Sequence, residues 1–173
     1  MSHENLAGRY DAALLDLDGT IYEGARAVPG ALEALTEAGL PMLFVTNNAS
    51  RAPETVADQL RGLGYDCGAE DVITSAQAAI EMAADVIPEG SKVLVLGADS
   101  FKDLARGAGY EVVDSADDEP AAVFQGHNPN TNWAMMSEAA LSISRGAKYL
   151  ASNLDTTLPT ERGLLVGNGS MVA

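Results

Sequence analysis

The sequence predicts an α/β fold in which helices cover both faces of a mostly parallel sheet. Short apolar runs alternate with segments of helical periodicity that proline or glycine residues bound. Two apolar runs, residues 12–15 and 42–45, end directly at polar clusters. The segment between them has the length of one strand–helix–strand crossover, as a parallel sheet requires.

The first predicted strand runs into two carboxylates, Asp16 and Asp18, which Gly19 follows. A carboxylate can attack an electrophile such as phosphorus, while a second carboxylate exchanges protons with the leaving group and with water. A divalent cation would reduce the repulsion between a carboxylate and a phosphate. An acidic turn that only closes the strand fits these residues equally well.

The rest of the N-terminal half repeats the alternation of strand and helix. Pro29 suits the first turn of a helix that Gly39 ends, Gly64 ends a second helix, and Ser75 is expected to cap a third. The predicted helices cover residues 29–38, 53–63 and 75–86, and the further strands cover residues 42–45 and 72–74.

Polar residues follow two of these strands. Asp16 and Asp18 come after the first strand, and Thr46 and Asn47 come after the second. Ligands of parallel sheets lie beyond the carboxyl ends of the strands. We therefore expect these four residues at one edge of the sheet.

A break near residues 88–90 precedes a second alternating pattern. The acidic run 114–119 is interpreted as a solvated loop. The polar loop 152–159 is a candidate for contact with substrate, although an Asp-Thr turn before a proline is the simpler interpretation. The predicted strands are 92–96, 111–113, 121–125 and 148–151. The predicted helices are 101–106 and 132–145, and Asn130 or Thr131 is expected to cap the helix at 132–145.

Composition narrows the functional class. The formal net charge of −15 and the scattered Lys and Arg residues argue against a nucleic-acid surface. The sequence has no export signal and no run of 18 apolar residues, so no membrane association and a cytoplasmic location are expected. Cys67 is the single cysteine, which excludes an intramolecular disulfide.

Two motifs resemble those of a known family. Asp16-Leu17-Asp18-Gly19-Thr20 resembles the first motif of the haloacid dehalogenase superfamily of phosphatases, and Thr46-Asn47-Asn48 resembles the second. The likeness narrows to the NagD or nitrophenylphosphatase branch, because Asp-Gly-Thr-Ile-Tyr-x-Gly, Pro-Gly-Ala, Thr-Asn-Asn-x-Ser-Arg and Thr-Ser occur in the expected order. The resemblance implies a Rossmann-like core in residues 1–88 and an inserted α/β cap domain in residues 89–173.

The resemblance also implies a role for each motif residue. Asp16 would be the nucleophile that forms an aspartyl-phosphate, and Asp18 would act as the acid and base. Thr46 would hold the phosphoryl oxygens through its hydroxyl, with help from the backbone N–H of Asn47. Mg²⁺ would bind the Asp16 carboxylate and the Asp18 backbone carbonyl.

The resemblance identifies residues 153–159 as the specificity loop, which includes Asp155 and Leu158. Leu158 stands where members that act on pyridoxal phosphate have a histidine. An aliphatic residue there is similar to the phosphoglycolate and glycerol-3-phosphate phosphatases. The expected substrate is therefore a small phosphorylated metabolite, with glycerol 3-phosphate ahead of 2-phosphoglycolate, and caps of this branch imply a possible homodimer.

Two family motifs do not occur. The third motif supplies a lysine, usually in Gly-Lys-Pro, and the fourth has an acidic pair after Gly-Asp, but no glycine here is followed by Asp and the lysines are Lys92, Lys102 and Lys148. Both motifs would lie beyond Ala173, so the chain is expected to be truncated. A phosphate-ligand-binding protein with a degenerate site is the alternative function, and a phospho-accepting receiver ranks last because it does not explain the cap-like half.

The missing motifs generate a prediction. The 173-residue chain on its own is expected to be inactive or very slow, because a phosphate-neutralising lysine and further metal carboxylates are absent from it. The measurement is phosphomonoester turnover by the purified chain with and without magnesium. Metal-dependent turnover at rates ordinary for the family would contradict the expectation.

Overall fold

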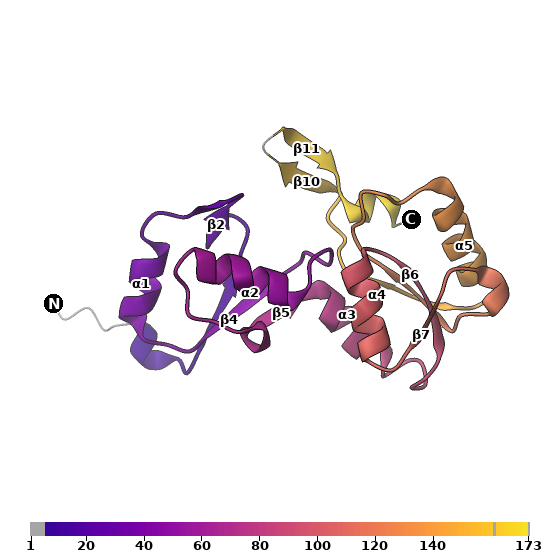
Figure 1. Cartoon of the computed structure of the whole chain (residues 1–173), viewed down its shortest axis with the longest axis horizontal. Coiled ribbons are helices and arrows are strands. Elements are labelled where there is room, and N and C mark those ends of the chain that lie inside the picture. The colour runs from indigo at the N-terminus through magenta and orange to yellow at the C-terminus, as the bar shows by residue number, and fades with distance from the viewer. Residues whose placement is uncertain (1–5, 161, 173) are drawn as a thin grey trace. The chain divides into compact units, whose positions relative to one another are not determined.

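The structure, a computed structural model, describes residues 6–160 and 162–172 (Figure 1). The chain divides into two compact units. The first comprises residues up to Thr46 together with Pro53–Ile73, and the second comprises Asn47–Ala52 and the residues from Thr74 onward. Each unit has its own sheet and its own apolar interior.

A three-stranded sheet with the order β1-β4-β5 forms the centre of the first unit. Strand β1 (Ala13–Asp16) pairs in parallel with β4 (Met42–Thr46), and β5 (Val72–Thr74) lies on the other side of β4. The remaining elements are the helices α1 (Ala31–Ala38) and α2 (Pro53–Gly62), a hairpin of β2 (Tyr22–Glu23) and β3 (Arg26–Ala27), and the 3-10 turns η1 (Leu6–Arg9) and η2 (Ala69–Asp71).

Apolar side chains from the sheet and α2 fill the interior of this unit. Leu17 and Phe44 are fully buried, and the ring of Phe44 meets the ring of Tyr65 edge-on at 5.7 Å between centroids. Helix α2 contributes Val56 and Leu60, which lie one turn apart on the same face. Helix α2 therefore buries the face that carries these two residues.

Two glycines end helices as expected. Gly39 follows α1 with a φ of 65°. Gly64 follows α2 with a φ of 99°, and the next residue, Tyr65, donates its N–H to the carbonyl of Leu60 at 3.1 Å. A side chain is rarely tolerated at such φ values, so glycine allows the chain to turn back toward the sheet.

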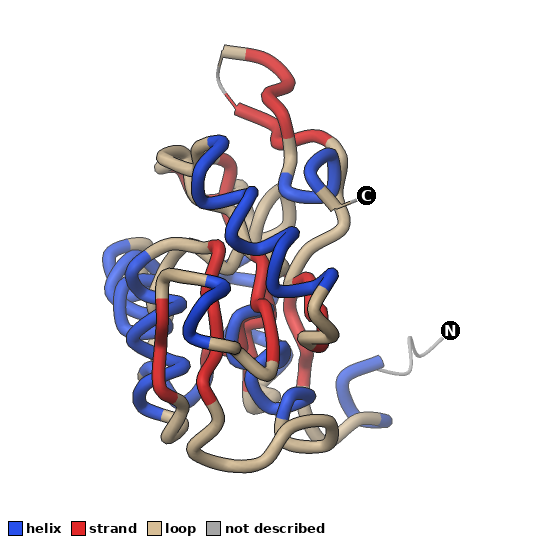
Figure 2. The backbone as a smooth tube through the Cα atoms, turned by 90° about the vertical axis from the view of Figure 1, so that its right-hand side faces the viewer, coloured by secondary structure: helices blue, strands red, loops and turns tan. Residues whose placement is uncertain are grey.

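The second unit contains a four-stranded sheet with the order β7-β6-β8-β9, and all neighbouring strands run parallel. The backbone tube in Figure 2 draws strands in red and helices in blue. The strands are β6 (Lys92–Leu96), β7 (Glu111–Val113), β8 (Ala122–Gln125) and β9 (Lys148–Ala151). The helices are α3 (Ser75–Ala83), α4 (Asp99–Gly107) and α5 (Trp133–Ser144). A hairpin of β10 (Thr157–Thr160) and β11 (Gly163–Val166) and the 3-10 turns η3 (Ala116–Asp118) and η4 (Asn168–Met171) complete the unit.

Helices cover both faces of this sheet, because successive residues of a strand point to opposite sides. Val93, Val95 and Phe124 belong to one buried cluster with residues of α3 and α4. Leu94, Leu96 and Val123 belong to a second buried cluster with Ala139 of α5. The α/β fold class with parallel sheets is thus confirmed.

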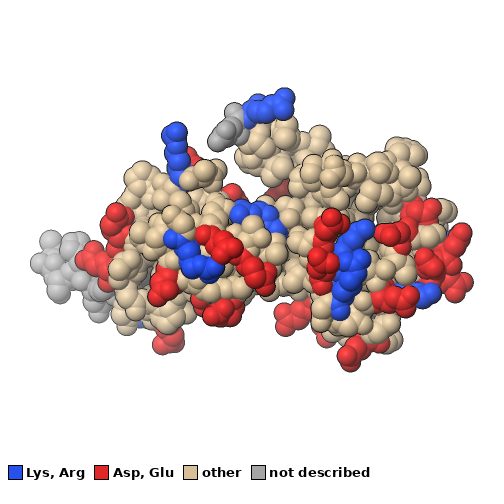
Figure 3. Space-filling model, viewed as in Figure 1, with Lys and Arg blue, Asp and Glu red and all other residues tan. Residues whose placement is uncertain are grey.

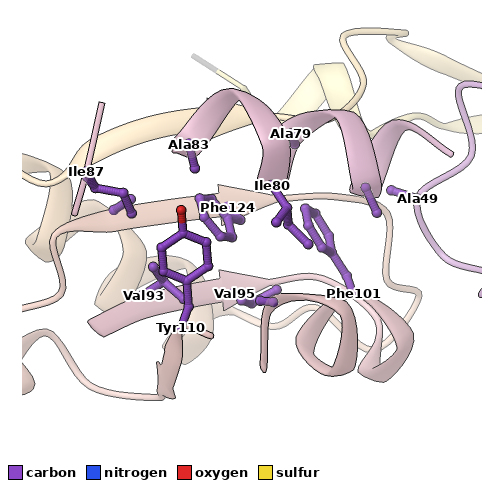
Figure 4. Close-up of a cluster of buried hydrophobic side chains, with 13 residues drawn as sticks. Ala49, Ala79, Ile80, Ala83, Ile87, Val93, Val95, Phe101, Tyr110 and Phe124 are labelled. Atoms are coloured by element: carbon purple, nitrogen blue, oxygen red, sulfur yellow. The ribbon is translucent and has the colours of Figure 1, made fainter. Parts of the chain in front are cut away.

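Phe124 lies at the centre of the first of these clusters (Figure 4). Its ring stacks on Phe101 of α4 at 6.0 Å and meets Tyr110 edge-on at 5.9 Å. Ile80 and Ala83 of α3 lie over the same strand. Small alanines on α3 allow that helix to approach the sheet closely.

The observed units divide the chain differently from the expected boundary at residue 88. Helix α3 belongs to the second unit, because its residues Ala76, Ala79 and Ala83 pack in the cluster around Phe124. The segment Asn47–Ala52 also belongs to the second unit, and Ala49 contributes to the same cluster. The assignment of residues 1–88 to a catalytic core and 89–173 to a cap stays a prediction.

Several element limits differ from the sequence predictions. Helix α3 ends at Ala83 and its cap is Thr74, whose Oγ1 accepts from the N–H of Gln77 at 3.3 Å. The cap of α5 is Asn132, whose Oδ1 accepts from the N–H of Met135 at 3.1 Å. Asn130 and Thr131 were therefore wrong predictions for this cap. Two hairpins, β2–β3 and β10–β11, were not predicted.

Acidic side chains are spread over the face of the molecule that Figure 3 displays, and Lys and Arg are scattered among them. No basic stripe of the kind that nucleic-acid binding needs is visible on that face. Among the residues that the structure describes, no helix is long and apolar enough to cross a membrane.

The central position of Phe124 makes its truncation costly. Replacing it in a Phe124→Ala variant is expected to lower the free energy of unfolding by about 3–5 kcal/mol, because a cavity replaces a fully buried ring. Trp133→Ala is the control, since Trp133 is 82% exposed and its loss should change stability by no more than about 0.5 kcal/mol. Urea denaturation followed by circular dichroism measures both, and equal losses would contradict the assignment of the core.

Candidate functional site

The end of β1 presents two acids on one side of the chain. Asp16 is the last residue of β1 and Asp18 lies two residues further, and both are exposed, whereas Leu17 between them is fully buried. Because successive residues of extended chain face opposite sides, Leu17 anchors the segment in the core while the two acids share the other side. This arrangement follows from the apolar and acidic residues alternating in the sequence.

A tight turn holds the chain after Asp18. The carbonyl of Leu17 accepts from the N–H groups of Thr20, Ile21 and Tyr22, at 3.2, 2.9 and 3.2 Å. Gly19, with a φ of 82°, donates its N–H to the carbonyl of Tyr22 at 2.8 Å. Glycine allows this left-handed conformation at little steric cost. The turn fixes the backbone that carries Asp18.

Strand β4 brings Thr46 to the same edge of the first unit. The parallel register places Asp16 opposite Val45, so Thr46 lies one residue beyond Asp16 along the neighbouring strand. Thr46 is only 4% exposed. The structure therefore brings three predicted site residues, Asp16, Asp18 and Thr46, to the carboxyl edge of the β1–β4 pair, as the sequence predicts.

Asn47 and Asp155 meet within the second unit. The side-chain amide of Asn47 donates to Oδ2 of Asp155 at 2.5 Å. The backbone carbonyl of Asn47 accepts from Oγ of Ser75 at 2.8 Å and from Nδ2 of Asn153 at 3.0 Å. The specificity loop proposed from sequence thus contacts Asn47 of the second motif.

Leu158 does not lie in a loop. It is the second residue of β10 and pairs with Leu165 of β11 in an antiparallel hairpin. The expected loop at 152–159 is therefore wrong for residues 157–159, which form a strand in spite of Pro159. A strand tolerates proline at a position where the backbone nitrogen does not have to donate a hydrogen bond to the neighbouring strand.

The donor atoms at the end of β1 suit a hard cation. In the part of the chain that the structure describes, no ion pair involves Asp16, and no three His, Cys, Asp or Glu side chains gather as a metal cluster. An ion held by the Asp16 carboxylate and a backbone carbonyl would keep most of its ligands as water. Mg²⁺ has this preference, so these residues fit the expected metal.

Cys67 is not suited to be a nucleophile. It is 7% exposed, and burial, with the nearby Asp71 carboxylate, raises the pKa of its thiol. A raised pKa disfavours the thiolate, which is the reactive form. This agrees with the sequence, where the glycine-flanked setting of Cys67 offers no activation.

A group of buried polar residues in the second unit was not predicted from the sequence. Asn168 and Gln125 are 2% and 4% exposed, and the side-chain amide of Asn168 donates to the carbonyl of Asn153 at 2.6 Å. In the sequence, the only available signal of this group is the pair of glycines on either side of Asn168.

Comparisons with known proteins agree on one family. A family model described as haloacid dehalogenase-like hydrolase matches residues 13–111. The chain is 44% identical over 170 residues to D-glycerol 3-phosphate phosphatase from Mycobacterium tuberculosis. The matched region covers 98% of this chain and 48% of that protein. The chain therefore spans about half the length of this relative.

Solved structures of phosphatases resemble this chain in fold. A glycerol phosphate phosphatase from Mycobacterium tuberculosis in complex with magnesium matches with a TM-score of 0.92 and 44% identity, over 96% of this chain and 50% of that one. A p-nitrophenyl phosphatase from Archaeoglobus fulgidus matches with a TM-score of 0.84 and 28% identity, over 94% of this chain and 62% of that one.

Proposed function

The chain belongs to the haloacid dehalogenase-like hydrolases, and we propose that the protein is a magnesium-dependent phosphomonoester hydrolase that works through an aspartyl-phosphate. The observation that carries the proposal is the placement of Asp16, Asp18 and Thr46 at one strand edge. Three oxygen-bearing side chains of this kind suit transfer of a phosphoryl group.

Asp16 acts as the nucleophile in this proposal. Its exposed carboxylate attacks the phosphorus atom, a phosphorus–oxygen bond forms to Asp16, and the bond to the leaving alcohol breaks. The proton that the leaving oxygen needs comes from Asp18. Asp18 then takes a proton from the water that attacks the aspartyl-phosphate, which releases inorganic phosphate and restores Asp16.

Thr46 and the backbone N–H of Asn47 hold the phosphoryl oxygens during both steps. A short buried hydroxyl donor fixed at the end of a strand costs little reorganisation when charge develops on those oxygens. Magnesium, bound by the Asp16 carboxylate and the Asp18 carbonyl, would supply the positive charge that lets a carboxylate approach a phosphate.

Glycerol 3-phosphate is the proposed substrate, ahead of 2-phosphoglycolate. The aliphatic Leu158 supports a small acyclic ester, because it offers no partner for a pyridine ring. The likeness to a D-glycerol 3-phosphate phosphatase supports the same substrate. A homodimer through the second unit and a cytoplasmic location are further proposals that rest on family membership.

A phosphate-binding protein without turnover is the second candidate. The position of Thr46 at the end of β4 supports it as well, because holding a phosphate requires no nucleophile. The two functions differ in one measurement, since the binder would take up inorganic phosphate in calorimetry while leaving phosphomonoesters intact.

The proposed mechanism requires Asp16. In the full-length protein, Asp16→Asn is expected to reduce turnover of phosphomonoesters by at least about 1000-fold, because an amide cannot form the covalent intermediate. Removal of metal with EDTA should also abolish turnover, and added magnesium should restore it. The matched control is Asp11→Asn, an exposed acid at the other end of β1, which should leave turnover unchanged. Substantial turnover by the Asp16→Asn variant would exclude the mechanism.

The substrate assignment predicts the effect of a histidine at position 158. Wild-type full-length protein should hydrolyse glycerol 3-phosphate with a higher kcat/KM than pyridoxal phosphate. Leu158→His should lower that ratio by about tenfold or more, since an aromatic ring can stack on the pyridine. Leu164→His is the control, because Leu164 pairs with Pro159 and so faces the other side of the hairpin. Equal kcat/KM values for the two esters in the wild type would count against the assignment.

A further inference from the structure

We propose that Asn168 is a positioning residue that holds the loop bearing Asp155, so that Asp155 meets the non-phosphate end of the substrate in one orientation. The proposal rests on the proposed function and on the family resemblance, which places Asp155 in the specificity loop. It concerns contacts within the second unit alone. Four observations carry it, from the sheet outward to the loop.

The first observation is a hydrogen-bonded chain that starts on the sheet. Gln125 is the last residue of β8, and its Oε1 accepts from the hydroxyl of Tyr149 on β9 at 2.7 Å. Its Nε2 donates to Oδ1 of Asn168 at 3.5 Å. Two neighbouring parallel strands thus hold Gln125 beside the Asn168 amide.

The second observation is a hydrogen bond that joins Asn168 to the loop. Nδ2 of Asn168 donates to the carbonyl of Asn153 at 2.6 Å. Oδ1 of Asn153 accepts from the N–H of Asp155 at 2.7 Å. Both the backbone and the side chain of Asn153 are therefore used, one toward Asn168 and the other toward Asp155.

The third observation is the close approach of the two glycines that flank Asn168 to the backbone of the loop. A Cβ on Gly169 would lie 1.9 Å from the carbonyl oxygen of Leu154, and one on Gly167 would lie 2.3 Å from that of Asp155. The N–H of Gly169 donates to the carbonyl of Asp155 at 2.8 Å. The chain around Asn168 lies directly against the loop backbone, and no side chain fits between them.

The fourth observation is the exposure of the loop itself. Leu154, Asp155 and Thr156 are all exposed, so no apolar core fixes their conformation. Hydrogen bonds hold the loop instead, from the exposed Asn47 on one side and from the buried Asn168 on the other. Since a misplacement of about 1 Å in a substrate-positioning group can cost about 100-fold in rate, a residue that fixes such a loop affects selection of substrate.

Asn168→Asp is the variant that tests this role. It keeps the shape and the acceptor of the side chain but replaces the donor to Asn153 with an oxygen. In the full-length protein, the KM for glycerol 3-phosphate should rise about tenfold or more, and the kcat/KM ratio of glycerol 3-phosphate to p-nitrophenyl phosphate should fall by a similar factor. Tyr149→Phe should change the ratio in the same direction by less.

Ser142→Ala is the matched control. Ser142 is also 2% exposed and also donates to a backbone carbonyl, that of Glu138 at 2.8 Å, but it lies in α5 away from this network. A merely structural role for Asn168 predicts that both variants lower the melting temperature and that neither changes the substrate ratio. An unchanged ratio in Asn168→Asp therefore overturns the proposal.

Amide hydrogen exchange separates this proposal from the proposed function. In Asn168→Asp, but not in Ser142→Ala, the amides of Asp155, Gly167 and Gly169 should exchange at least about tenfold faster than in the wild type. Absence of turnover in the wild type would overturn the proposed function, and exchange would then decide the positioning role. Unchanged exchange at these amides overturns that role whether or not the protein is an enzyme.

Discussion

The parallel pairing of β1 with β4 is the constraint on which the candidate site depends. The register sets Asp16 opposite Val45, and it places the acids of one strand beside Thr46 of the next. A slip of one residue would reverse the two faces of β1, which would bury Asp16 and expose Leu17. Burying an unpaired carboxylate costs several kcal/mol, and exposing a leucine costs about 2 kcal/mol more. The register that buries Leu17 is therefore also the one that exposes Asp16.

Much of the fold was predictable because its signals are local. The limits of β5, β6, β7 and β9 match the predicted strands 72–74, 92–96, 111–113 and 148–151, since each is a short apolar run between turn residues. The hairpin of β10 and β11 was not predicted, because the polar and proline-containing run 157–160 becomes a strand only by pairing with 163–166. The cap of α5 was placed one or two residues early, since several adjacent Asn and Thr residues offer the same side-chain acceptor.

In the candidate site, too, residues with a local sequence signal were predictable, and residues defined by distant contacts were not. The placement of Asp16, Asp18 and Thr46 at one strand edge was predictable, because a polar residue after a buried strand is visible in the sequence without knowledge of contacts. Asn168 was not found, because its partners Asn153 and Gln125 lie 15 and 43 residues away along the chain. A buried amide carries no local signal of its role, since the same residue in a turn would look identical.

Directional contacts explain why the second unit uses buried amides where an apolar residue would pack as well. Apolar contacts are non-directional, so an aliphatic side chain at position 168 would fill the space while leaving the exposed loop 154–156 several conformations of similar energy. An amide that has lost one partner costs about 1–3 kcal/mol when it is buried, which penalises every conformation that breaks the bond from Asn168 to Asn153. In the proposed positioning role, these bonds hold the loop in one arrangement without a core of its own, so that Asp155 is exposed and yet fixed in place.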